Sequence, residues 1–218
     1  MITGINGFAG YFCTMPFVAR ASYVDNFFSE ESHFCQLYTL RIQQLNSTHW
    51  SPLIVAYKAS QFLAEKPGVR ILDIGSGVGK FCMAGAYYKP DIFFYGVEQR
   101  GYLVEIAKSA QAKLGRMKVQ FENRNFTQVD FSNYDHFYFY NSFFENLPGS
   151  SRIDDNIDHS PELFHYYNRF LSKKLSERPA GTRIVTYQST GFEIPPGYSL
   201  VDMQMNNELK FWIKCSDV

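Results

Sequence analysis

The chain has 218 residues, which suits one full-sized domain and allows a large core without disulfides or metals. Its 21 lysines and arginines balance 21 aspartates and glutamates. There is therefore no overall basic field to hold a polyanion, which argues against a nucleic-acid partner. No apolar run reaches the roughly 18 residues that a membrane-spanning helix needs, so no membrane partner is expected.

The four cysteines have no spacing typical of a zinc site or of a disulfide framework. We therefore expect reduced thiols, a cytoplasmic location and no bound metal. The cysteines are Cys13, Cys35, Cys82 and Cys215.

The first 50 residues give weak, mixed signals, and we interpret them as an N-terminal extension or cap in front of a domain at residues 51–218. Residues 1–19 are apolar and rich in glycine but lack the basic start of a secretory signal, so we expect a loosely held segment. One helix is expected at residues 31–45. The oligomeric state cannot be inferred from the sequence.

From residue 51 onward, helices and strands alternate. Ser51 and Pro52 predict a helix start, with the hydroxyl as N-cap and proline at the first helical position. Further helices are expected at residues 79–88, 102–114 and 162–175. Strands are expected at residues 70–74, 92–98, 118–122, 135–140 and 182–188. Strands joined by crossover helices predict an α/β, doubly wound, mostly parallel sheet with helices on both faces.

The last part of the domain differs from this pattern. Two short strands are expected at residues 199–203 and 209–214, with Asn206 and Asn207 between them. This spacing leaves no room for a crossover helix, so the two strands should form an antiparallel C-terminal hairpin.

A glycine-rich loop follows the first of these strands. Gly75, Gly77 and Gly79 stand at alternating positions between a strand and a helix. Glycine permits positive φ and lets a ligand approach the backbone closely. Glu98 ends the next strand, at roughly the 20-residue distance at which a carboxylate can accept both ribose hydroxyls of a nucleoside. These features predict a cofactor that contains a nucleoside.

Two cofactor classes compete for this arrangement. Dinucleotide loops usually read G-x-G-x-x-G, whereas this loop reads G-x-G-x-G and follows an acid, Asp73. An acid suits a cofactor with a sulfonium and an ammonium better than it suits a pyrophosphate. The antiparallel hairpin also argues against a dinucleotide domain. S-adenosyl-L-methionine is therefore favoured, and an NAD-dependent oxidoreductase is the weaker alternative.

Over residues 51–218 these features resemble the class I, or Rossmann-like, S-adenosylmethionine-dependent methyltransferases. The resemblance implies a seven-stranded sheet in the order 3-2-1-4-5-7-6. It implies that the glycine loop and its acid hold the methionine part of the cofactor, and that Glu98 holds the ribose. Asn125 stands where the family often has an aspartate near the adenine amine, and Phe126 would cover the ring. The cofactor-binding residues so implied are Asp73, Gly75, Ser76, Gly77, Gly79, Glu98, Gln99, Asn125, Phe126 and Asn141.

The end of the fourth strand would lie beside the transferred methyl group. Asn141-Ser142-Phe143-Phe144 resembles in part the Asn-Pro-Pro-Tyr sequence of enzymes that methylate amide or amine nitrogens. The resemblance thus implies a nitrogen acceptor. We expect the Asn141 side chain or a nearby carbonyl to orient it, and Glu145 is a candidate proton acceptor. The alternative is that Asn141 only caps the strand. The loop and the later Asn-x-Phe are also faintly similar to the non-SET histone-lysine methyltransferases.

Three further residues are candidates for contact with the substrate, namely His49, Trp50 and Phe143. His49 could act as a base or could simply be exposed, and Trp50 could stack on substrate or plug the sheet edge. Asp154, Asp155 and Asp158 are expected to form a solvated loop face, unless their segment is a substrate lid. The methyl acceptor would be a protein side chain or a small molecule. A methyltransferase-like module that binds a cofactor or a protein without catalysis is the alternative function.

Overall fold

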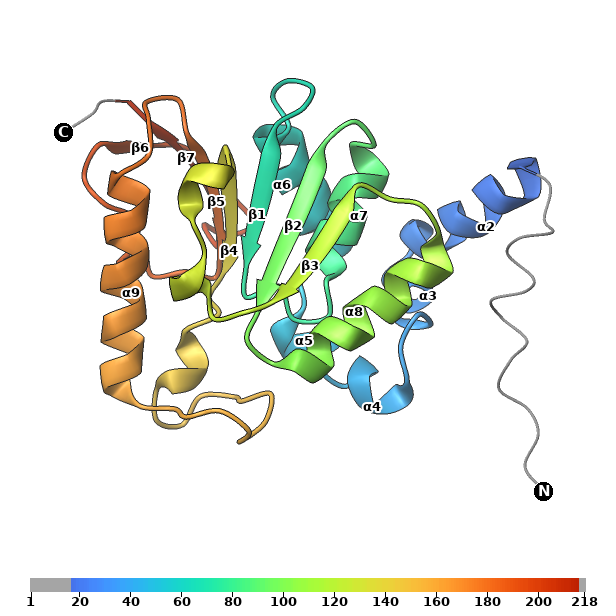
Figure 1. Ribbon diagram of the computed structural model, residues 1–218, viewed down its shortest axis with the longest axis horizontal. Helices are drawn as coiled ribbons and strands as arrows, with labels where there is room; N and C mark the ends of the chain where they lie inside the picture. Colours follow the sequence, from blue (N-terminus) through green and yellow to red (C-terminus); the bar gives the residue numbers. More distant parts are fainter. Residues whose placement is uncertain (1–16, 216–218) are drawn as a thin grey trace.

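The computed structural model describes residues 17–215 and is built on a seven-stranded sheet. The strand order is β3-β2-β1-β4-β5-β7-β6, which confirms the order that the resemblance implied (Figure 1). The strands β1 to β5 are parallel, whereas β7 pairs antiparallel with both β5 and β6. The strands are β1 (Arg70–Ile74), β2 (Phe93–Glu98), β3 (Val119–Asn123), β4 (His136–Tyr140), β5 (Arg183–Tyr187), β6 (Tyr198–Gln204) and β7 (Leu209–Lys214).

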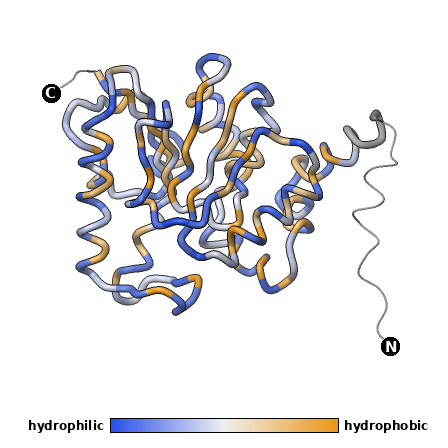
Figure 2. Tube along the Cα trace, in the orientation of Figure 1, coloured by the Kyte–Doolittle hydropathy of each residue, from blue (hydrophilic) through white to orange (hydrophobic). Residues whose placement is uncertain are grey.

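Helices cover both faces of the sheet, as the alternation of elements predicted. The longer helices are α2 (Phe17–Ser29), α6 (Leu53–Leu63), α7 (Lys80–Tyr88), α8 (Gly101–Leu114) and α9 (Pro161–Ser176). Helices α6, α7 and α8 share one core cluster with alternate strand residues such as Ile71, and α9 packs on the other face with residues such as Leu72. In Figure 2 the trace of α9 alternates between apolar and polar residues, as expected for a helix with one buried face.

The expectation of one helix at residues 31–45 is wrong. The segment forms α3 (Glu31–Cys35) and α4 (Leu40–Gln43), and α5 (Asn46–His49) follows. Thr39, before α4, has extended backbone angles of φ −68° and ψ 155°, which interrupt a helix. The break lets successive turns bury Phe34 and Tyr38 in the core cluster that also contains α6 and α7.

The division of the chain at residue 50 stays a prediction. Residues 1–16, with Cys13 and most of the segment expected to be loosely held, lie outside the described residues. Cys35 and Cys82 are buried free thiols, and Cys215 is an exposed one. Within residues 17–215, no helix combines the length and the apolar character of a membrane span.

The predicted hydroxyl cap of α6 is also wrong. The helix begins at Leu53 after Pro52, and the Ser51 side chain makes no cap. The Ser51 hydroxyl instead pairs with the Tyr138 hydroxyl on β4, at 2.7 Å. The Leu53 amide donates to the carboxylate of Glu31, which is distant in sequence. The helix is therefore capped by the N-terminal segment, which ties that segment to the domain.

Candidate functional site

A cleft of about 300 Å³ opens where the strands β1, β2 and β4 end. It brings together nearly all the residues that the sequence singled out for the cofactor, the substrate and the chemistry. The exception is Gly79, which does not line it. The predicted residues that line it are His49, Trp50, Asp73, Gly75, Ser76, Gly77, Glu98, Gln99, Asn125, Phe126, Asn141, Phe143 and Glu145.

The three glycines of the loop all have positive φ, of 79°, 52° and 81° along the chain. A Cβ on Gly75 would lie 2.3 Å from the Ser142 hydroxyl oxygen, and one on Gly79 would lie 2.3 Å from the Phe121 ring. These two glycines allow close packing within the protein. Gly77 has open space around it, so only there does a missing side chain leave room for a ligand.

Replacing Gly75 with alanine should lower the free energy of unfolding by about 1–3 kcal/mol, because a left-handed backbone and a contact with Ser142 are both strained. The matched control is Gly77→Ala, which has the backbone strain without the contact. Urea unfolding of the two variants measures the difference. Equal losses would show that the contact with Ser142 is relieved at no cost.

Asp73 lies at the inner end of the cleft and is almost completely buried. Desolvation raises the pKa of its carboxyl group to about 8, although the Cys82 thiol, 3.6 Å away, donates to it and opposes the rise. The carboxyl group is therefore largely neutral at pH 7. A ligand with a positive charge at this place would favour the ionised form, so the site suits a cationic group.

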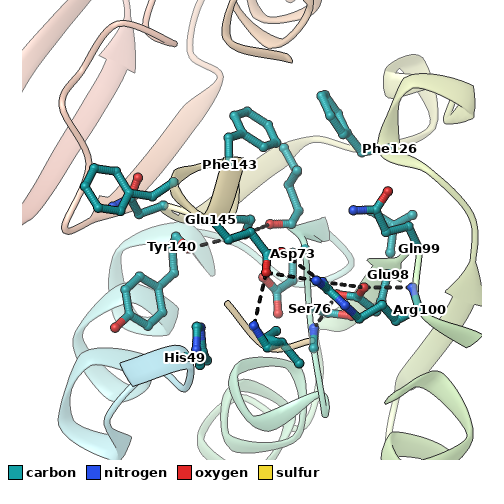
Figure 3. Close-up of a pocket in the computed structure, with 18 of the residues that line it drawn as sticks. His49, Asp73, Ser76, Glu98, Gln99, Arg100, Phe126, Tyr140, Phe143 and Glu145 are labelled. Atoms are coloured by element: carbon teal, nitrogen blue, oxygen red, sulfur yellow. Dashed lines mark hydrogen bonds and ion pairs between the residues drawn. The ribbon is translucent and has the colours of Figure 1, made fainter. Parts of the chain in front are cut away.

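Glu98 ends β2 and is held by backbone donors (Figure 3). Its two oxygens accept hydrogen bonds from the Arg100 amide at 2.8 Å and from the Gly77 amide at 3.1 Å. Burial raises the pKa of the carboxyl group, and these hydrogen bonds oppose the rise. Each oxygen keeps a second lone pair, so the fixed carboxylate can accept hydroxyl groups such as those of a ribose.

An aromatic wall closes the side of the cleft next to Glu98. The rings of Phe126 and Phe143 stack with 4.9 Å between their centroids, and the Tyr167 ring meets Phe126 edge-on at 5.3 Å. Flat apolar side chains of this kind suit a planar heterocycle. Tyr167 comes from α9 and was not predicted, because only the fold brings that helix to the cleft.

Asn125 lies beside this wall, but its polar atoms already have partners. Its carbonyl oxygen accepts from the amide and the hydroxyl of Thr127, and its amide nitrogen donates to Gln99 and Tyr167. The residue thus caps the short helix η1 (Phe126–Gln128) and orders the aromatic wall. Its direct contact with an adenine amine stays a prediction.

Asn141 follows β4 with a left-handed backbone, at φ 37°. Strained backbones of this kind concentrate at functional sites. Among the described residues, the Asn141 amide group makes no hydrogen bond, whereas the next side chain, Ser142, donates to the Ile74 carbonyl at 2.9 Å. The Asn141 amide is thus available to a ligand.

Arg100 also lines the cleft and was not predicted from the sequence. Its side chain is only 2% exposed and makes two hydrogen bonds of 2.8 Å to Glu145. It also donates to Asp154 at 3.1 Å. It lies 4.0 Å from Glu98, beside which Figure 3 shows it. An arginine two residues after Glu98, followed by acids in a later loop, was the available signal.

The acidic loop differs from the solvated face that was expected. Asp154 accepts from Arg100 and from the Tyr102 hydroxyl, and its side chain is only 18% exposed. These two hydrogen bonds therefore hold residues 149–160 against the cleft. Asp155 is exposed, as expected.

His49 and Trp50 enter the cleft from the segment before α6. Burial lowers the pKa of the His49 ring, and its Nε2 lies 3.3 Å from the Ser151 hydroxyl. The lowered pKa favours the neutral ring, which connects the N-terminal segment to the acidic loop. Trp50 is buried and packs on Tyr38, so most of its ring belongs to the core.

Comparison with known proteins gives a consistent result. Residues 65–159 match the family model of a methyltransferase domain, whereas a search of curated proteins gave no match. The chain is similar to the crystal structure of TrmN from Thermus thermophilus, with 17% identity and a TM-score of 0.53 over 79% of this chain and 51% of that one. The chain therefore spans about half the length of that protein.

Two further structures are similar over most of their length. An RNA methyltransferase from Salinibacter ruber, in complex with S-adenosyl-L-homocysteine, has 18% identity and a TM-score of 0.51 over 76% of this chain and 92% of that one. Magnesium protoporphyrin IX methyltransferase from Synechocystis, with bound S-adenosylmethionine, has 14% identity and a TM-score of 0.53 over 89% of this chain and 96% of that one. Identities this low show a shared fold.

Proposed function

We propose that this chain, which belongs to the class I methyltransferases by its fold and its methyltransferase domain, methylates a nitrogen acceptor with S-adenosylmethionine. The observation that supports this best is the arrangement of the cleft. A buried acid suited to a cation, a fixed carboxylate suited to a ribose and an aromatic wall follow one another around an open glycine loop. A buried acid at this place suits a cationic cofactor better than the pyrophosphate of NAD, which counts against an NAD-dependent oxidoreductase.

The residues of the cleft fit S-adenosylmethionine by their chemistry. Asp73 would hold the ammonium of the amino-acid end, Glu98 the ribose hydroxyls, and Phe126 with Phe143 the adenine ring. The cofactor supplies an electrophilic methyl group on a sulfonium. Transfer by in-line displacement needs little covalent chemistry from the protein, because alignment of the nucleophile lowers most of the barrier.

Asn141 would orient the acceptor, with its amide oxygen accepting a hydrogen bond from the nitrogen nucleophile. Glu145 keeps its proposed role as proton acceptor, which requires the amine to compete with Arg100 for one carboxylate oxygen. Replacing Asn141 with alanine should lower kcat about 10²-fold or more, with little change in affinity for S-adenosyl-L-homocysteine. If kcat and the affinity for S-adenosyl-L-homocysteine fall by the same factor, Asn141 acts only in cofactor binding.

We further propose that the acceptor is a protein side chain or a small molecule. The chain has no net charge that would attract a polyanion, which supports this choice over a nucleic acid. A module that binds the cofactor without catalysis is the alternative function. It predicts binding of S-adenosyl-L-homocysteine but no methyl transfer to any acceptor.

The first experiment is calorimetric titration of the protein with S-adenosylmethionine, S-adenosyl-L-homocysteine and NAD. We expect micromolar binding of the two sulfur compounds and none of NAD. Glu98→Gln keeps the shape of the side chain but loses its charge. It should weaken binding of both sulfur compounds at least tenfold, since hydrogen bonds to a charged group contribute about 1.5–3 kcal/mol. Binding of NAD alone would overturn the proposal.

A further inference from the structure

A buried lysine on the wall of the cleft has no role in the function proposed above. Lys80 is the first residue of α7, directly after the glycine loop. Lys80 is among the residues that line the cleft, and only 2% of its side chain is exposed. Burial lowers the pKa of the ammonium, and the Glu31 carboxylate opposes that effect. A buried charge is costly to keep, so its retention needs a reason.

The surroundings of this ammonium resemble an incomplete anion site. It donates to the Glu31 carboxylate and, at 3.0 Å, to the Asn46 side-chain oxygen. The rings of Phe34 and Trp50 lie 5.5 and 5.7 Å from it. Glu31, its one ionic partner among residues 17–215, has a 43% exposed side chain and also caps α6. The counter-ion thus comes from the outside of the cleft, and no anion within the described residues reaches the ammonium from the cleft itself.

Asp73 and Lys80 stand at the two ends of the glycine loop and both line the same cleft. One can carry a negative charge and the other a positive charge, and Gly77, between them in the sequence, leaves open space. A free α-amino acid group has the complementary pair of charges, an ammonium and a carboxylate. The wall therefore matches a zwitterion better than it matches a simple cation.

We propose that Lys80, held in place by Asn46, binds the carboxylate at the amino-acid end of the cofactor. This inference rests on the proposed function. The ligand carboxylate would join Glu31 on the buried ammonium, and the N-terminal segment would thereby form part of the cofactor site. Glu31 is then a resident counter-ion that competes with the ligand.

A purely structural role makes different predictions. If the ion pair only fixes the N-terminal helices, then Lys80→Met and Glu31→Gln should have similar effects on every ligand. If Lys80 binds the ligand carboxylate, Lys80→Met should weaken only ligands that have one. Glu31→Gln should leave their affinity unchanged or increase it, since the ammonium loses a competing anion.

The test is calorimetry with three probes. S-adenosylmethionine has the carboxylate, its decarboxylated analogue has only the ammonium, and 5′-methylthioadenosine has neither. We expect the wild-type protein to bind the decarboxylated analogue at least tenfold more weakly than S-adenosylmethionine. Lys80→Met should abolish that difference and leave binding of 5′-methylthioadenosine within twofold.

The outcomes separate the two proposals. Equal affinity of the wild-type protein for S-adenosylmethionine and its decarboxylated analogue would overturn the role of Lys80, and this comparison needs no variant that could fail to fold. Equal weakening of all three probes by Lys80→Met would overturn it as well. No binding of any probe to the wild-type protein would overturn the proposed function itself.

Discussion

Arg100→Met should lower the free energy of unfolding by about 3–5 kcal/mol, as expected when one partner of a buried ion pair is removed. The arginine side chain is 2% exposed, and its loss leaves Glu145 and Asp154 without the guanidinium that pairs with both of them. Urea unfolding at low salt measures the effect. We also expect residues 149–160 to become sensitive to proteolysis, because Arg100 holds them against the cleft.

The control for this prediction is Arg100→Met combined with Glu145→Met and Asp154→Asn. Removing the orphaned charges should restore most of the lost stability, since apolar groups often replace a buried ion pair without loss. A loss below 1 kcal/mol in the single variant would contradict the prediction. It would mean that water reaches the two carboxylates and screens them.

Cofactor affinity should rise with pH up to about 8, because Asp73 must ionise to hold the ammonium. The carboxyl group has a pKa of about 8 in the free protein, raised mainly by desolvation. Below that value each unit of pH should therefore change the affinity for S-adenosylmethionine by up to tenfold. Calorimetry in buffers of different ionisation enthalpy should also detect release of a proton on binding.

The same group predicts the pH dependence of stability. The pKa of Asp73 in the folded protein lies above its ordinary value of 3.8, so between these values only the folded state keeps the proton. The contribution of Asp73 protonation to the free energy of unfolding is fully present below pH 3.8 and is lost as the pH rises towards 8. Asp73→Asn should remove this slope and bind S-adenosylmethionine at least tenfold more weakly. If Asp73→Asn keeps the wild-type pH dependence of the free energy of unfolding, another group causes that dependence.

The fold of residues 51–215 could be predicted well because its signals are local. Each strand and helix has its own periodicity, and the glycine loop needs only neighbouring residues to be recognised. The N-terminal helices could not be predicted in the same way. Thr39 breaks the helical run because Phe34 and Tyr38 must reach a distant core, and the sequence around them carries no sign of that core.

The residues of the candidate site also fall into those that local signals predict and those that they do not. Asp73 and Glu98 were predicted because they stand at fixed places relative to a strand end. Arg100 and Lys80 were missed because their importance comes from partners far away along the chain, such as Glu145 and Glu31. Only the folded chain shows that these two cations are buried.

The position of β7 has a consequence for the way the chain is synthesised. β7 lies between β5 and β6, although β6 precedes it in the sequence. While a ribosome is still making β7, β6 has no neighbour and β5 has an open edge. The side chains of Leu200, Val201 and Met203 on β6 are at least 40% exposed even in the folded protein. A nascent chain stalled at this point would therefore present an unpaired apolar strand, which is the form most open to aggregation and to capture by chaperones.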